Sequence, residues 1–294
     1  MMMPASRGRV QEAAVLAPMT WFRVGGAAEF LVRPADAEDL GAFFRALPLE
    51  VPVTVVGAAS NLIIRDGGVH GVVVKLARGF GEIVVETDGM IAGAAALDVT
   101  VAEHAAAAGL GGLEFLSGIP GTIGGAVAMN AGAYGGDVAG VLDWVEMVER
   151  SGELVRVQAG ALNMGYRHAS LAADAVVVRA RLRAAPGEPA AIAGRMRQIK
   201  ESREASQPVR ARTGGSTFAN PPDQKAWELI DAAGCRGLRR GGAKVSELHC
   251  NFLINDENAT AADLEGLGEE VRRRVLAASG VSLRWEIKRI GVPA

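Results

Sequence analysis

The sequence predicts an α+β fold up to about residue 185, followed by a smaller unit. Many short candidate strands and few helices occupy the first part, without the regular strand–helix alternation of a parallel α/β sheet. Glycine accounts for 38 of 294 residues, which indicates sharp turns and close approach of backbone to a ligand. A boundary is expected near 186–212, where a helix follows a Pro/Gly break and a linker-like stretch precedes a compact helix–strand–helix region, so we expect two domains.

Each element of the first part is predicted from its local pattern. Asp36 precedes a helix with an acidic first turn. Thr100 and Glu103 have the spacing of a capping box, and Gly109 is placed to end the helix that follows. A hairpin is expected around Ser151. Apolar runs predict strands at 51–56, 71–76, 81–86, 90–95 and 175–184.

The second part is predicted in the same way. A helix follows the break at 186–188, and another has Asp223 as its cap and Gly234 as its stop. Residues 251–256 form a candidate strand, and 262–280 a helix. The last segment, 281–290, alternates apolar and polar side chains as a half-buried strand does.

Composition excludes several classes of function. The formal net charge is −2 and the pI is near 6.1, so we expect no nucleic-acid partner. Cys235 and Cys250 are too few for a disulfide framework, and no Cys/His cluster indicates a metal site. No apolar stretch reaches the length of a membrane span, and the N-terminus lacks a clear cleavage signal. We therefore expect a cytoplasmic protein without a membrane partner.

Two loops of small residues are candidates for phosphate binding. GAASNL at 57–62 follows a candidate strand, and small residues let backbone N–H groups converge on an anion. GIPGTIGGAVAMNAGAYGG at 118–136 is longer, but it matches neither the Rossmann nor the Walker A spacing. A plain connection remains an alternative for the first loop, and tight packing of loops for the second.

Polar side chains elsewhere could carry chemistry. Arg167 offers a planar fork for a carboxylate, whereas neighbouring His168 is better interpreted as a surface histidine. Ser216 lies in GGSTFANPP, which is turn-like and does not match the GxSxG of a nucleophile elbow. Glu286 lies on the polar face of its segment and could simply be solvated. The basic loop at 239–252 could bind a phosphorylated ligand, or its charges could simply be solvated.

Taken in order along the chain, these stretches resemble the UDP-N-acetylenolpyruvoylglucosamine reductase family. The resemblance runs from MTWFRVGGAAEFLVRP (19–34) to LRWEIKRIG (283–291) and includes both small-residue loops, YRHASL, GGSTFANP and AWELIDAAGCRGLRRGGAKVSELHCNFLIN. The short span from Arg167 to Ser216 is similar to that of the family's shorter type.

The resemblance implies a flavin-binding domain of the vanillyl-alcohol-oxidase (PCMH) type plus a smaller α/β substrate-binding domain. The implied domains are 1–200, completed by the C-terminal strand 281–294, and 201–280. It further implies an oxidoreductase with non-covalent FAD and NADPH as co-substrate. The substrate would be UDP-N-acetylglucosamine enolpyruvate, a small molecule reduced to UDP-N-acetylmuramate in peptidoglycan synthesis. We expect a monomer.

The resemblance also assigns site residues. It implies catalytic roles for Ser216 as proton donor, Arg167 on the substrate carboxylate and Glu286 in support. Tyr166, Asn220, Arg239 and Lys244 would bind the substrate. The cofactor-binding residues would be Gly57, Ala58, Ala59, Ser60, Asn61, Leu62, Ser117, Gly118, Ile119, Pro120, Gly121, Gly124, Gly125, Ala126, Met129, Asn130, Ala131 and Gly132.

One position departs from the family pattern. Many members have Lys after the Phe of GSTFKNP, whereas this chain has Ala219. If that Lys orients the ligand, another cation must do so here, and Arg239, Arg240 and Lys244 are candidates. A flavin oxidase on the same fold and a flavin- or nucleotide-binding protein without catalysis are the alternative functions.

Overall fold

A computed structural model describes residues 3–294 of the chain. Contacts divide the chain into two compact units. Unit 1 comprises the chain up to Glu12, Phe30–Ala58 and Gly71–Ser202. Unit 2 comprises Ala13–Glu29, Ala59–His70 and Arg203–Ala294. The functional domain limits expected from the sequence stay a prediction.

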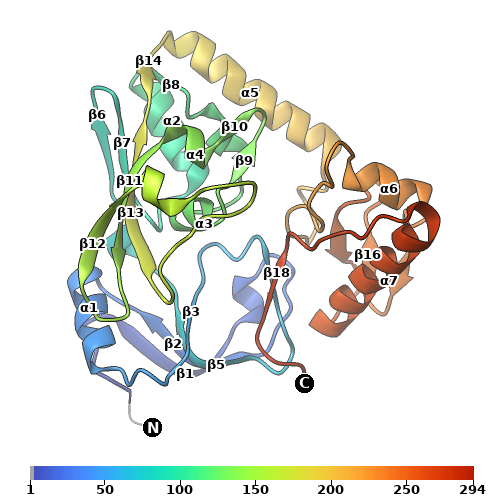
Figure 1. Cartoon of the computed structure of the whole chain (residues 1–294), viewed down its shortest axis with the longest axis horizontal. Coiled ribbons are helices and arrows are strands. Elements are labelled where there is room, and N and C mark those ends of the chain that lie inside the picture. The colour runs from blue at the N-terminus through green and yellow to red at the C-terminus, as the bar shows by residue number, and fades with distance from the viewer. Residues whose placement is uncertain (1–2) are drawn as a thin grey trace. The chain divides into compact units, whose positions relative to one another are not determined.

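A five-stranded antiparallel sheet forms the centre of unit 1 (Figure 1). Its order is β12-β11-β13-β7-β6, and all four pairings are antiparallel. The predicted hairpin at Ser151 is confirmed as the link between β11 and β12. The strands are β6 Ile83–Glu86, β7 Gly89–Gly93, β11 Leu142–Val148, β12 Leu154–Gln158 and β13 Val176–Arg183.

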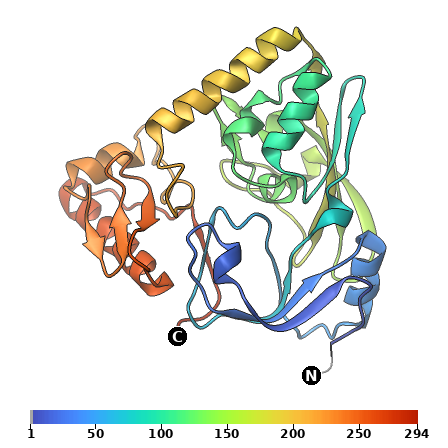
Figure 2. The ribbon, with the colours of Figure 1, turned by 180° about the vertical axis from the view of Figure 1, so that it is seen from behind.

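Helices pack against this sheet in unit 1. Contacts join α2 and α3 to β7, and α1 packs at β11, as seen from behind in Figure 2. Asp36 caps α1 by accepting from the Asp39 N–H, as its position predicts. Gly109 follows α2 with a φ of +68°, which confirms its role as the helix stop. The helices are α1 Ala37–Ala46, α2 Asp98–Ala107, α3 Ile123–Ala128, α4 Val138–Val141 and α5 Pro189–Ser206.

A second sheet has the order β1-β2-β5-β3, with β3 parallel to β5. Short two-stranded ladders join β8 to β14, β9 to β10 and β4 to β18. These strands are β1 Arg9–Val15, β2 Ala27–Arg33, β3 Val53–Val55, β4 Leu62–Ile64, β5 Val69–Val74, β8 Leu110–Gly111, β9 Gly132–Ala133, β10 Gly136–Asp137, β14 Ala185–Pro186 and β18 Lys288–Ile290.

Unit 2 contains a small sheet, β15-β16-β17, on which α7 packs (Figure 1). Thr260 and Asp263 form a capping box at the start of α7, and Gly280 ends it with a φ of +74°. The elements are α6 Ala226–Ala232, α7 Ala261–Ser279, β15 Arg239–Arg240, β16 Ala243–Val245 and β17 Leu253–Asn255.

Three local predictions are wrong. Helix α2 begins at Asp98, so Thr100 and Glu103 form no capping box; the bridge between Leu97 and Thr122 fixes the chain just before the helix. Helix α6 begins at Ala226, and Asp223 lies in a turn with a φ of +57°. The Ala226 N–H donates instead to Asn220 Oδ1.

The third error concerns the last strand, which covers only Lys288–Ile290 rather than 281–290. Upstream, Trp285 makes a single bridge to Phe218, and the Leu283 carbonyl accepts from Arg272 Nε of α7. The alternation of burial nevertheless holds, because Leu283 and Ile287 are buried and the residues between them are more exposed.

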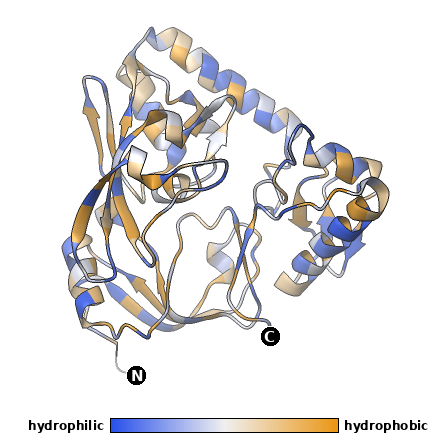
Figure 3. Cartoon of the chain, viewed as in Figure 1, coloured by the Kyte–Doolittle hydropathy of each residue, from blue (hydrophilic) through white to orange (hydrophobic). Residues whose placement is uncertain are grey.

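The buried side chains form two clusters in unit 1 and one in unit 2. Figure 3 shows the alternating hydropathy along the strands of the five-stranded sheet and the largely hydrophilic surface of α5. Of α5, only Ile192 and Ile199 are buried. Among the described residues, no helix has the length and apolar character needed to span a membrane.

Candidate active site

A cavity of about 300 Å³ in unit 1 lies where the two small-residue loops meet. Gly57 and Ala58 line it from the first loop, and Gly124 and Gly125 from the second. The remaining lining residues are Val55, Val56, Lys75, Leu76, Ala94, Ala95, Leu97, Thr122, Ala128, Leu171, Ala175 and Val177. We call this the small-residue cavity.

Backbone pairing shapes the small-residue cavity. The Ile123 N–H donates to the Ala96 carbonyl at 3.0 Å, and the Gly124 N–H to Ala94 at 2.9 Å. A Cβ on Gly124 would lie 2.9 Å from the Ala94 Cβ, and one on Gly57 would lie 2.7 Å from Thr122 Oγ1. Glycine is therefore required at both positions for the loops to approach one another.

Lys75 is the one charged side chain among the residues of this cavity, all of which lie in the described chain. Its Nζ donates to the Gly57 carbonyl at 2.5 Å. Burial lowers the pKa of Lys75, and the nearby Arg33 charge lowers it further. The sequence does not indicate a role for Lys75, because an apolar run such as GVVVKL does not show that its lysine lines a cavity.

Other residues of the second loop are fixed outside the small-residue cavity. Asn130 is buried with a φ of +41°; its Nδ2 donates to the Gly165 carbonyl and its Oδ1 accepts from Ala139 N–H. Ser117 Oγ donates to the Glu114 carbonyl at 2.7 Å. Residues 118–121, Ala126, Met129, Ala131 and Gly132 belong to the same loop of unit 1 but do not line the cavity.

Arg167 is joined to the end of the second loop. Its Nη2 donates to the Gly132 carbonyl at 3.0 Å, and its guanidinium lies 5.2 Å from the centre of the Tyr166 ring. The residue has a φ of +56°, which is unusual for a side chain other than glycine, asparagine or aspartate. His168 is exposed and within hydrogen-bond distance of Ser170 Oγ, as its interpretation as a surface histidine requires.

Ser216 and Glu286 lie on neighbouring segments of unit 2. The Glu286 N–H donates to the Thr217 carbonyl at 2.9 Å, and the Ala219 N–H donates to Arg284 at 2.9 Å. Phe218 and Trp285 pair at the centre of this short ladder, with ring centres 5.1 Å apart. Ser216 is half-buried and directly precedes Thr217, the residue that pairs with Glu286.

The glycines before Ser216 have a structural purpose. A Cβ on Gly214 would lie 2.7 Å from the Phe22 ring, and the Gly215 N–H donates to the Ser60 carbonyl at 3.2 Å. Asn61 then completes the arrangement, because its Nδ2 donates to the Glu286 carbonyl at 3.0 Å. Unit 2 therefore ties Ala59–Leu62, the second half of the first loop, to both Ser216 and Glu286.

The predicted substrate residues are less concentrated. Tyr166 lies in unit 1 and is 54% exposed. Asn220 is exposed and its Oδ1 accepts from the first N–H of α6. Arg239 pairs with Asp256, and Lys244 Nζ lies 2.8 Å from Glu247 Oε1. These two cations already have carboxylate partners.

Comparisons with known proteins agree with this arrangement. Residues 28–158 match the FAD binding domain model, and 207–290 match the model of the UDP-N-acetylenolpyruvoylglucosamine reductase C-terminal domain. The UDP-N-acetylenolpyruvoylglucosamine reductase of Granulibacter bethesdensis is 67% identical over 98% of this chain and 93% of its own length. The UDP-N-acetylenolpyruvoylglucosamine reductase of Acidiphilium cryptum is 66% identical over 99% of this chain and 94% of its own length.

The chain belongs to the UDP-N-acetylenolpyruvoylglucosamine reductase family. The crystal structure of the reductase from Thermus caldophilus has a TM-score of 0.83 and 36% identity, covering 96% of this chain and 99% of that one. Family membership confirms the predicted flavin-binding fold of the vanillyl-alcohol-oxidase type. The protein is an FAD-dependent oxidoreductase of peptidoglycan precursor synthesis, with NADPH as the reductant.

The small-residue cavity suits FAD as this family requires. Its walls are backbone, glycine, alanine and aliphatic side chains, which fit a flat ring system or a nucleotide without polar competition. Its single ammonium fits a diphosphate group. Neither cysteine nor histidine is among its lining residues, and the non-covalent attachment of the cofactor stays a prediction.

Asp98, which the sequence does not single out, is completely buried, and neither carboxylate oxygen has a hydrogen-bond partner among residues 3–294. Burial raises the pKa of Asp98 to about 8. Its Oδ2 would lie 2.6 Å from a Cβ on Gly121, so the carboxyl group packs against the second loop. Nothing in the pattern DVTVAEHAAA marks this aspartate as buried.

Proposed function

We propose that Ser216, Glu286 and Arg167 act on the substrate in the reduction of UDP-N-acetylglucosamine enolpyruvate to UDP-N-acetylmuramate. The reaction adds hydride to one carbon of the enolpyruvyl double bond and a proton to the other. When bound, FAD would supply the redox chemistry that links NADPH oxidation to reduction of the substrate. The protein side chains must then stabilise charge on the enolpyruvyl carboxylate and provide the proton.

Arg167 is proposed to bind the substrate carboxylate. A guanidinium offers paired N–H donors that match a carboxylate, and donors fixed in advance stabilise enolate charge best. The hydrogen bond to the Gly132 carbonyl and the Tyr166 ring support this role, because they restrain the side chain. The left-handed backbone is the kind of strain often found at functional residues.

Ser216 is proposed to donate the proton to the substrate carbon. A hydroxyl is a weak acid, but it can protonate a strongly basic enolate held within hydrogen-bond reach. The observation that carries this proposal is the ladder in unit 2, which fixes the Ser216 loop beside Glu286 and Asn61. Glu286 is proposed to assist activation of the same carboxylate-bearing carbon.

The cofactor would be held by both loops. We assign the cofactor-binding role to 57–62, 117–121, 124–126 and 129–132, with Lys75 as the cation that offsets the diphosphate charge. Substrate contacts from Tyr166, Asn220, Arg239 and Lys244 remain part of the proposal. For Arg239 and Lys244 the substrate phosphates would have to exchange with Asp256 and Glu247.

We also propose that the protein acts as a cytoplasmic monomer without nucleic-acid partners, with FAD-binding regions at 1–200 and 281–294 and a substrate domain at 201–280. NADPH and a UDP-sugar as reactants support the location. Size-exclusion chromatography with light scattering tests the monomer directly.

Anaerobic spectroscopy tests the function. We expect NADPH to bleach the flavin absorbance of the purified holoenzyme, and UDP-N-acetylglucosamine enolpyruvate to restore it without oxygen. Recovery of colour with oxygen but not with this substrate would instead indicate a flavin oxidase. A preparation that neither contains nor takes up FAD would contradict both enzymes.

A further inference from the structure

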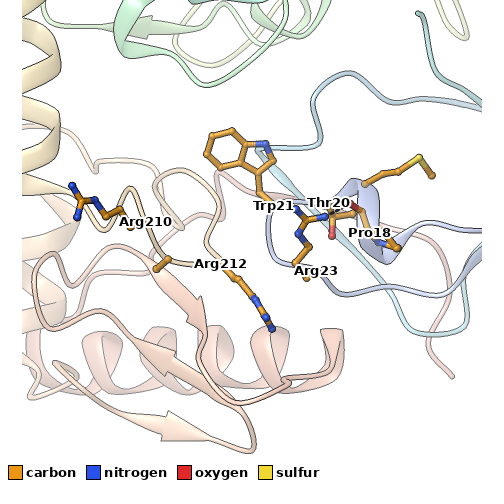
Figure 4. A pocket seen from close by; sticks show the side chains of 8 residues that line it. Pro18, Thr20, Trp21, Arg23, Arg210 and Arg212 are labelled. Carbon is orange, nitrogen blue, oxygen red and sulfur yellow. Dashed lines mark hydrogen bonds between the residues drawn. The ribbon is translucent and has the colours of Figure 1, made fainter.

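A second cavity, of about 510 Å³, lies within unit 2 and is lined by Pro18–Trp21, Arg23 and Arg210–Arg212 (Figure 4). Two chain segments separated by almost two hundred residues therefore build it. We call it the arginine pocket. The roles proposed above do not use any of its residues.

The arginine pocket has an unbalanced positive charge. It is lined by Arg23, Arg210 and Arg212, with no aspartate or glutamate. Within residues 3–294, none of these guanidinium groups forms an ion pair with a carboxylate; Arg23 donates to the Pro18 carbonyl. Several other arginines of unit 2 do pair with acids, as Arg236 does with Asp231 at 2.8 Å. Unpaired cations lining one open cavity favour an anionic ligand.

Local structure fixes one wall of the pocket. Thr20 is buried, and its Oγ1 donates to the Ala17 carbonyl and accepts from the Val24 N–H. This turn holds Arg23 in a left-handed conformation with a φ of +58°. Such strain in a non-glycine residue suggests a functional reason for the arginine. The Trp21 N–H donates to the Ala59 carbonyl at 3.4 Å, which joins the turn to the first loop.

Figure 4 shows how the side chains are arranged. The Trp21 indole extends into the open space, whereas Arg210 points away from Trp21 and Arg23. Arg212 also points away from the indole, so the three arginines lie on different sides of the pocket. A pocket lined by an aromatic ring and by guanidinium groups suits a ligand that combines an aromatic base with a phosphate.

We infer that the arginine pocket binds the adenosine 2′-phosphate end of NADPH. This inference rests on NADPH as the reductant of the proposed function. NADPH differs from NADH by one phosphate monoester, whose charge approaches −2 at neutral pH. Arginine is the residue that accommodates a 2′-phosphate, whereas an acidic residue binds the free ribose hydroxyl of NADH. The pocket has the arginines and lacks the acid.

Arg23→Gln and Arg212→Gln test the inference in the holoenzyme, with Arg197→Gln as the matched control. Arg197 is exposed on α5 and lies outside the pocket. Stopped-flow reduction under anaerobic conditions gives the apparent Kd of NADPH and the limiting rate. We expect each pocket variant to raise the Kd about 10- to 100-fold, as loss of a charged hydrogen bond does, with an unchanged limiting rate. The Kd for NADH should hardly change.

Calorimetry with nucleotide fragments makes the test independent of catalysis. We expect 2′,5′-ADP to bind the wild-type holoenzyme more tightly than 5′-ADP, UDP or inorganic phosphate, and both pocket variants to remove this preference. An unchanged NADPH Kd in both variants would overturn the inference, as would a loss of UDP binding alone, which would assign the pocket to the substrate. If NADPH fails to reduce the wild-type flavin while 2′,5′-ADP still binds, the proposed function fails and the pocket stands.

Discussion

Two cavities of the described chain contrast in the way they could hold a ligand. The small-residue cavity of unit 1 is built from backbone and aliphatic side chains, with Lys75 as its charged member. The arginine pocket of unit 2 is open and polar, and three arginines and a tryptophan line it. The first resembles a permanent cofactor site, in which shape dominates, and the second a site for a charged reactant that binds and leaves.

This difference predicts how the binding of each ligand should respond to salt. A cation within a confined, apolar cavity is weakly screened, so its effect on a bound diphosphate should persist at high salt. Exposed arginines are screened by salt, so their ligand should respond to ionic strength. The two predictions on ligand binding come first, from the larger expected effect to the smaller, and a prediction on stability follows.

Replacement of Lys75 should have the largest effect on the small-residue cavity. We expect Lys75→Met to weaken FAD binding about 10- to 100-fold, because a buried charge-assisted contact to the diphosphate is lost. Equilibrium titration of the apoprotein with FAD and with riboflavin measures this. Riboflavin lacks the diphosphate, so its affinity should stay within about twofold of wild type.

Lys75→Arg is the matched control, since it keeps the charge, and it should recover most of the FAD affinity. Equal losses for FAD and riboflavin in Lys75→Met would show that Lys75 supports the fold of the cavity rather than the diphosphate.

Salt should separate the two cavities. When the ionic strength is raised, we expect the apparent Kd of NADPH to increase about fivefold, whereas the affinity for FAD should change little. Stopped-flow reduction and flavin titration at the same salt concentrations provide the comparison. If both ligands respond equally, the contrast drawn between the two sites is wrong.

Asp98 should affect stability rather than ligand binding. Its native pKa is raised to about 8 from 3.8, so the native state retains a proton that the unfolded chain loses between these values. The free energy of unfolding should therefore decrease as pH rises from about 4 to 8, by at most about 1.4 kcal/mol per pH unit from this group.

Asp98→Asn keeps the shape of the side chain without the charge. The free energy of unfolding of the variant, relative to wild type, should be about 1 kcal/mol larger at pH 7 than at pH 6. Urea unfolding at both pH values measures this difference. A difference between variant and wild type that is independent of pH would show that Asp98 finds a partner for its charge.

Local signals predicted much of the fold. Asp36 and Gly109 were identified because a cap or a stop depends on immediate neighbours. The capping box at Thr100 failed because a bridge from Leu97 to Thr122, distant in sequence, fixes where α2 begins. The strand at 281–290 was overestimated because the Leu283 carbonyl accepts a hydrogen bond from the Arg272 side chain of α7.

The candidate site likewise includes residues that the sequence predicted and residues that only the structure reveals. Both loops and GGSTF were found from composition and resemblance, but only the structure selects the four glycine and alanine residues that line one cavity. Lys75 and Asp98 escaped notice because burial and cavity lining depend on tertiary packing. The arginine pocket escaped because Arg23 and Arg212 meet only after folding.

The central claim is that Ser216 supplies the proton in the second half of the reaction, and the Ser216→Ala holoenzyme tests it most directly. Anaerobic stopped-flow spectroscopy measures flavin reduction by NADPH and reoxidation by UDP-N-acetylglucosamine enolpyruvate separately. We predict normal reduction and reoxidation slowed about 10²- to 10⁴-fold, as loss of a general acid typically causes. Reoxidation at the wild-type rate, or equal slowing of both steps, would contradict this role.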